Sequence, residues 1–126
     1  MKTTDLMIGD WVDYNGTYQQ VEEIYSFDNR VYLSEDEDVD CPDIYPIPLT
    51  SDLLLANGFT SIPDLFGFLS ADGRISIDPS VPNYPRKWYA HIDNEDFQSI
   101  ASCDIDYLHQ LQNLLTICGI EKEWKL

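Results

Sequence analysis

The chain changes character at Tyr45-Pro-Ile-Pro-Leu-Thr-Ser-Asp-Leu-Leu-Leu-Ala-Asn-Gly-Phe59, where two prolines lead into a short apolar run that Asn-Gly closes. Proline fixes its own φ and biases the preceding residue away from the α region, so the two prolines predict an extended approach. Thr50 or Ser51 can cap a helix, and the Asn-Gly pair tolerates the left-handed conformation that ends one. We therefore predict a short hinge helix at about residues 50–57, which joins two β-rich halves of the chain.

The half before the hinge has the pattern of short strands separated by tight turns. Asn15-Gly16 is its strongest hairpin signal, because a type I′ turn needs a positive φ at both central positions. An acidic loop is predicted at residues 35–43. The strands are predicted at residues 11–14, 17–26, 30–33 and 44–47. Short strands at this spacing predict a small SH3-like β-barrel or meander over residues 1–49.

The half after the hinge has the pattern of an antiparallel sheet followed by one longer helix. Asp72-Gly73 predicts a second hairpin. Asp104 or Asp106 is expected to cap the helix, and Gly119 is expected to end it. The predicted apolar stripe of this helix is Leu108, Leu111, Leu115 and Cys118, with Gln110, Gln112 and Asn113 mostly opposite and His109 at its flank. The strands are predicted at residues 64–70, 74–78, 87–92, 97–101 and 120–126.

These patterns together predict an α+β fold. Its expected parts are the N-terminal SH3-like barrel or meander, the short hinge helix, and an antiparallel sheet with one C-terminal amphipathic helix at about residues 105–118. We expect residues 50–126 to form a second, α+β subdomain that packs with the first as one compact unit.

The charge of the chain is strongly one-sided. The 126 residues include 23 acidic and 7 basic ones, for a formal net charge of -16, and residues 31–73 and 88–121 contain no Lys or Arg. A hydrophobic content of 44% and an aromatic content of 13% are enough for a packed core and argue against a disordered acidic tail. A negative surface repels nucleic-acid phosphates and anionic membranes, so we expect a basic protein partner, no direct nucleic-acid binding and no membrane association. The oligomeric state stays open.

The cysteines and the N-terminus indicate a reducing compartment. Cys41, Cys103 and Cys118 are odd in number, widely separated and without Cys-x-x-Cys spacing, which favours free thiols over disulfides or a zinc site. The N-terminal residues lack the apolar run of a signal peptide, so a cytoplasmic protein is expected. No phosphate-binding loop or catalytic motif is present in the sequence. We therefore expect neither an enzyme nor a bound cofactor or metal.

The motifs at several points of the chain resemble one family. They are Leu6-Met-Ile-Gly-Asp-Trp-Val12, Pro46-Ile-Pro-Leu-Thr50, Asn57-Gly-Phe59, Trp88-Tyr-Ala-His-Ile92, Tyr107-Leu-His-Gln-Leu-Gln112 and Cys118-Gly-Ile-Glu-Lys-Glu123. This combination resembles small uncharacterised proteins carried by phages, prophages and conjugative elements of gut Bacteroidales. The resemblance implies a cytoplasmic accessory protein of a mobile element, and it implies no activity and no catalytic residues.

The candidate binding residues come from the acidic loop and from the aromatic residues of the first half. Exposed aromatics on a small barrel can form a groove for a peptide or a modified residue, although the same rings can also fill its core. The loop begins like an EF-hand at Asp36, but Cys41 stands where that motif needs glycine and Ile47 where it needs glutamate. The candidate residues are Glu35, Asp36, Glu37, Asp38, Asp40, Trp11, Tyr14 and Tyr32.

Two alternative functions remain open at the level of sequence. The acidic groups at residues 35–43 and 93–106 could present carboxylates as a nucleic-acid mimic, which would inhibit a DNA- or RNA-binding host protein. Alternatively His91, Asp93 and Asp96 could form a small metal-dependent enzyme site if they converge.

Overall fold

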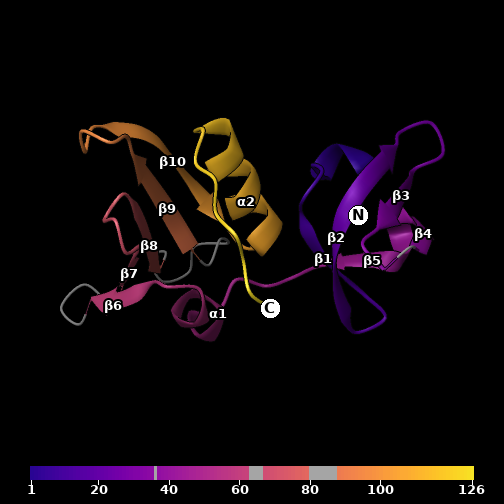
Figure 1. The fold of residues 1–126 in the computed structure, drawn as a ribbon, viewed down its shortest axis with the longest axis horizontal. Helices are drawn as coiled ribbons and strands as arrows, with labels where there is room; N and C mark the ends of the chain where they lie inside the picture. Colours follow the sequence, from indigo (N-terminus) through magenta and orange to yellow (C-terminus); the bar gives the residue numbers. More distant parts are fainter. Residues whose placement is uncertain (36, 63–66, 80–87) are drawn as a thin grey trace. The chain divides into compact units, whose positions relative to one another are not determined.

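The computed structural model describes residues 1–35, 37–62, 67–79 and 88–126. Within these residues the chain is a mixed α+β protein with two antiparallel sheets and two α-helices (Figure 1). The elements in chain order are η1 (Thr3–Asp5), β1 (Trp11–Tyr14), β2 (Thr17–Tyr25), β3 (Arg30–Leu33), β4 (Glu37–Asp40), η2 (Cys41–Asp43), β5 (Ile44–Pro46), α1 (Ser51–Ala56), β6 (Thr60–Ile62), β7 (Gly67–Leu69), β8 (Ile75–Pro79), β9 (Trp88–Asp93), β10 (Ser99–Ile105) and α2 (Leu108–Ile117), where η marks a 3₁₀-helix.

The fold consists of two compact units. The first unit contains Met1–Pro48 and Tyr107–Asn113, and the second contains Leu49–Asp106 and Leu114–Leu126. The first unit therefore holds η1, η2 and β1 to β5, and the second holds α1 and β6 to β10. Helix α2 is divided, because its first part belongs to the first unit and its last part to the second.

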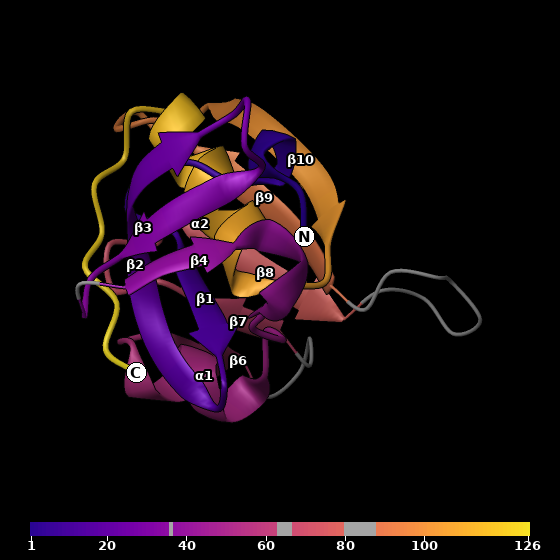
Figure 2. The ribbon, with the colours of Figure 1, turned by 90° about the vertical axis from the view of Figure 1, so that its right-hand side faces the viewer.

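The first sheet has the strand order β4-β3-β2-β1-β5, with every neighbouring pair antiparallel. Figure 2 labels β1 to β4 of this sheet. The predicted hairpin is confirmed, since Asn15 and Gly16 have φ values of 52° and 81° between β1 and β2. The register shifts between Val21 and Glu23, a bulge at which a strand such as β2 bends. The described strands form two open sheets and no closed barrel. The core of this unit is Leu6, Val12, Val21, Val31, Leu33, Val39, Cys41 and Ile44.

The acidic segment is more ordered than the sequence predicts. The prediction of a loop through residues 35–43 is wrong for its described part after residue 36, where Glu37–Asp40 forms β4 and Cys41–Asp43 forms η2. The physical reason is Val39, which is buried opposite Val31 and anchors the strand despite its charged neighbours. Cross-strand packing of such pairs outweighs the low strand propensity of Asp and Glu.

The short helix predicted at about residues 50–57 is confirmed as α1, with both of its ends. Thr50 caps α1, because its Oγ1 accepts a hydrogen bond from Leu53 N at 3.2 Å. Gly58 has a φ of 87°, and Phe59 N donates to Leu54 O at 3.1 Å, which is the bond of a Schellman stop. Phe59, at the position where that motif places its hydrophobic residue, is buried.

The second sheet has the order β10-β9-β8-β7-β6, again with antiparallel neighbours. The hairpin at Asp72-Gly73 is confirmed between β7 and β8, and Gly73 has a φ of 76°. The strands predicted at residues 64–70 and 87–92 are present at β7 and β9, but residues 64–66 and 87 lie outside the described ones. Strand β10 continues to Ile105 and so includes Asp104, which is not the helix cap.

The end of the chain differs from the prediction. Helix α2 ends as predicted at Gly119, whose φ is 74°, and Ile120 N donates to Leu115 O at 2.8 Å. The edge strand predicted at residues 120–126 is wrong, because this segment has no strand. Instead Trp124 is buried and stacks on Phe59 at a centroid distance of 6.1 Å. Ring burial and the side chain of Asn57, which bonds the Lys125 backbone, hold the segment without strand pairing.

Two side chains from the predicted polar side of α2, Gln112 and Asn113, make hydrogen bonds within the first unit. In the first unit Gln112 Oε1 accepts from Trp11 N at 2.8 Å, and its Nε2 donates to Gly9 O at 3.1 Å. Asn113 hydrogen-bonds the side chain of Asp10, which is only 2% exposed. The amide side chains of α2 thus bond polar groups at and next to β1, among them the backbone N of Trp11 and the carboxylate of Asp10.

Candidate functional site

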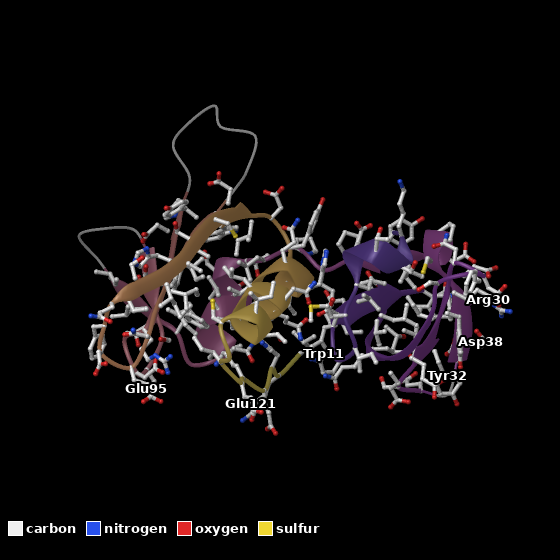
Figure 3. All side chains as sticks on the ribbon, turned by 90° about the horizontal axis from the view of Figure 1, so that it is seen from above. Trp11, Arg30, Tyr32, Asp38, Glu95 and Glu121 are labelled. Carbon is white, nitrogen blue, oxygen red and sulfur yellow. The ribbon has the colours of Figure 1, made fainter. Side chains whose placement is uncertain are left out.

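The outward side of β2, β3 and β4 carries alternating carboxylates and aromatic rings. The strand register sets Glu23, Tyr32 and Asp38 in one cross-strand row and Tyr25, Arg30 and Asp40 in the next. Figure 3 labels Arg30, Tyr32 and Asp38 on these strands. We call the six residues of the two rows the acidic–aromatic face.

This face follows from the alternation of the strands. Side chains of a strand point to opposite sides in turn, and Val31, Leu33 and Val39 point into the core of the first unit. The residues between them, including Tyr32 and Asp38, must therefore point outward. The pattern gives the outward side a strong negative charge, since Arg30 is the single basic member of the six-residue set.

Ion pairs and hydrogen bonds order the face. Arg30 Nη2 lies 3.3 Å from Asp38 Oδ1, and Arg30 Nε lies 3.2 Å from Asp40 Oδ1 without hydrogen-bond geometry. The Tyr25 hydroxyl donates to Glu23 Oε2. This hydrogen bond, with the negative charges of Glu23 and Asp38 adding to it, raises the pKa of Tyr25 above its ordinary value. The side chain of Tyr25 therefore stays neutral. Arg30 already contacts two of the three carboxylates of the face, those of Asp38 and Asp40.

The structure separates the predicted binding residues into two groups. Tyr32, Asp38 and Asp40 come together on the acidic–aromatic face. Glu37 pairs with the buried Leu33 and so lies on the opposite side of the sheet, and Tyr14 packs against the core.

The other predicted residues lie apart from that face. Glu35 is exposed in the turn before β4, where its backbone N donates to Gln19 Oε1 at 3.2 Å. Trp11 lies on β1 and is partly buried (Figure 3). Asp36 lies outside the described residues.

A second outward row was not singled out from the sequence. Strand pairing places Asp13 of β1 between Tyr18 of β2 and Tyr45 of β5. The two-residue Asn15-Gly16 loop already implies the first of these pairings, because it sets the register of the hairpin. The pairing of β1 with β5 joins segments distant in sequence, and no local signal indicates it.

The histidines do not form a metal site with the described residues. His91 Nε2 lies 2.9 Å from Asp93 Oδ1, while Asp96 is exposed in the turn that follows β9. No three His, Cys, Asp or Glu side chains in the described parts of the chain group around a point that could hold a metal ion. His109, which is predicted at the flank of the apolar stripe of α2, is 5% exposed, and its burial lowers its pKa. Cys41, Cys103 and Cys118 form no disulfide within the described residues.

No helix in the described ranges is both long enough and apolar enough to cross a membrane. Comparison with known proteins found no family model, no curated protein and no solved structure that matches the chain.

Proposed function

We propose that the chain is a non-enzymatic accessory protein of a mobile element, which acts in the cytoplasm and binds a basic protein partner through the acidic–aromatic face. One observation carries the proposal: the strand register gathers three carboxylates and two tyrosines on one outward side, with Arg30 as the single cation among them. The motif resemblance to proteins of Bacteroidales phages and conjugative elements supports the biological setting.

The first unit is, in this proposal, an SH3-like module. Its support is the antiparallel order β4-β3-β2-β1-β5 together with the 3₁₀-helix η2 directly before β5. Modules of this size commonly bind extended peptides across surfaces rich in aromatic and charged side chains. The bulged β2, which pairs with both β1 and β3, would carry the bend between the two halves of such a module.

The ion pairs and cation–π contacts available on this face predict that the basic partner binds with moderate affinity and in a salt-sensitive way. An exposed ion pair contributes about 0–1 kcal/mol, and an exposed cation–π contact about 0.5–1 kcal/mol. Several such contacts on one face add up only if the partner presents cations at matching positions. The net charge of -16 also speeds the encounter with a basic partner. At physiological salt this attraction is largely screened at distances beyond about 8 Å, so it weakens as salt rises.

A labelled peptide with arginine and lysine at alternate positions tests this function by fluorescence anisotropy. We compare the wild type with Asp38→Asn/Asp40→Asn and with Glu95→Gln/Asp96→Asn, a matched control that removes the same charge from an exposed turn of the second unit. We expect the first double variant to weaken binding roughly five- to tenfold and the control much less. Equal losses in both variants would mean that only net charge matters and would overturn the assignment of the face.

A nucleic-acid mimic is the second candidate function. The outward carboxylates of Glu23, Asp38 and Asp40 favour it, because they lie on adjacent strands of one surface. Duplex DNA carries one charge per about 1.7 Å of its axis, so a mimic needs a comparable density. If this function is correct, the protein should compete with duplex DNA for a basic DNA-binding domain, whereas a peptide-binding module should not displace DNA from it.

A further inference from the structure

A carboxylate between two exposed aromatic rings stands on the outward side of β1, β2 and β5. Asp13 pairs with Tyr18 on one side and with Tyr45 on the other. Tyr18 is 46% exposed and Tyr45 is 63% exposed, whereas Val12 and Ile44 on the opposite side of the same strands are buried. We propose that Tyr18, Asp13 and Tyr45 form a clamp for one arginine side chain of a protein partner.

The strand spacing fits a cation between the rings. Neighbouring strands lie about 4.8 Å apart, so the two tyrosines start from backbone positions about 10 Å apart, with Asp13 midway. Side chains stand roughly perpendicular to a sheet, so a cation above Asp13 would be about 5 Å from each ring. This separation is within the ~6 Å at which a cation interacts with an aromatic ring.

The carboxylate at the centre of the row is held in place. Asp13 Oδ1 accepts a hydrogen bond from Gly16 N at 2.9 Å, across the hairpin turn. A carboxylate has about four acceptor sites, so this bond leaves capacity for a ligand N–H group. A fixed acceptor loses less conformational entropy when it binds, which favours recognition at this position.

The chemistry of the row favours arginine over other cations. A guanidinium is planar, weakly hydrated and able to stack on aromatic rings while its N–H groups reach a carboxylate. A lysine ammonium is more strongly hydrated, and a trimethylated lysine has no N–H group for Asp13. The negative charge of the chain supplies the long-range attraction for any of them, so the contacts at the row decide the choice.

The clamp rests on the proposed function in one respect, because its arginine would belong to the basic partner. It is nevertheless a different surface from the acidic–aromatic face, which uses β3 and β4. The simpler explanation of the tyrosines is strand propensity, since aromatic residues are favoured in strands whatever they bind. Threonine shares that propensity, so Tyr18→Thr and Tyr45→Thr test the rings without changing it.

The test is an NMR titration with the peptide acetyl-Gly-Arg-Gly-amide and with its lysine and trimethyllysine counterparts. We expect the arginine peptide to shift the signals of Tyr18, Tyr45 and Gly16. Each Tyr→Thr variant should weaken its binding roughly two- to fivefold. Asp13→Asn should weaken it at least as much, although Asn keeps the acceptor for Gly16 N.

The outcomes separate the clamp from the proposed function. The absence of shifts at the two tyrosines up to about 10 mM peptide would overturn the clamp, as would tighter binding of the trimethyllysine peptide. Unchanged affinity in the three variants, with wild-type melting temperatures, would overturn it too. If the longer basic peptide still depends on Asp38 and Asp40 in that case, the proposed function survives. If only the tripeptide binds, the proposed function fails and the clamp survives.

Discussion

The carboxylate of Asp10 offers a quantitative test of the first unit. Asp10 is 2% exposed, and its Oδ2 accepts a hydrogen bond from Met7 N at 2.8 Å. Burial raises its pKa from 3.8 to about 6, although the bonds from Met7 N and the Asn113 side chain act in the opposite direction. Replacement of Asp10 by asparagine removes the buried charge and keeps an oxygen that can accept the hydrogen bond from Met7 N.

The sign and size of the effect of Asp10 on the free energy of unfolding follow from proton linkage. Between about pH 4 and pH 6 the folded state holds a proton on Asp10 that the unfolded state has released, so the free energy of unfolding falls as the pH rises through this window. Above about pH 6 the loss of unfolding free energy that Asp10 causes no longer changes with pH. The difference between 3.8 and about 6 is about two pKa units, which corresponds to about 3 kcal/mol. Asp10→Asn should therefore be about as stable as the wild type near pH 4 and up to about 3 kcal/mol more stable near pH 7.

Urea denaturation of both proteins at several pH values between about 4 and about 7 measures this difference. Asp96→Asn is the control, because it removes one charge from an exposed position and should change stability by less than about 0.5 kcal/mol at every pH. A difference between Asp10→Asn and the wild type that does not vary with pH would refute the reasoning. Lower stability of Asp10→Asn near pH 7 would refute it as well.

Three further predictions concern single side chains. Arg30→Gln removes the cation that already contacts Asp38 and should tighten binding of the basic peptide roughly two- to fivefold in the anisotropy assay, so unchanged or weaker binding would contradict competition for these carboxylates. Phe97 is 63% exposed at a φ of 59°, a conformation that a β-carbon strains and glycine adopts readily, so Phe97→Gly should be about 1 kcal/mol more stable than Phe97→Ala in thermal melts. Both variants lack the ring, and equal melting would rule out backbone strain. Thr50→Ala should destabilise the second unit by about 1 kcal/mol through loss of the bond to Leu53 N, with Thr50→Ser close to the wild type in the same melts.

The predictions that hold from sequence are those with a local cause. Asn15-Gly16 and Asp72-Gly73 form hairpins because glycine or asparagine can adopt the positive φ that the turns need. Helix α1 begins and ends where its cap and its glycine are, since both act on backbone groups within one turn. The α+β class and the general position of most strands follow in the same way from turn residues and alternation.

The predictions that fail concern residues whose partners are distant in the chain. Glu37–Asp40 looks like a solvated loop, but Val39 finds Val31 and the segment becomes a strand. The last residues alternate like a strand, but Trp124 instead stacks on Phe59, which burial of two rings favours over exposed strand pairing.

The sequence by itself determined the turns, the helix ends, the negative charge and the supply of tyrosines and carboxylates, because these depend on residue chemistry and on neighbours a few positions away. Only the tertiary structure decided which of them meet. Tyr32 lies beside Asp38, and Tyr45 lies beside Asp13, because the register between strands sets those pairs. The same folding put Tyr14 against the core and Glu37 on the other side of the sheet. Strand pairing is set by the total burial of many side chains, which no single segment encodes.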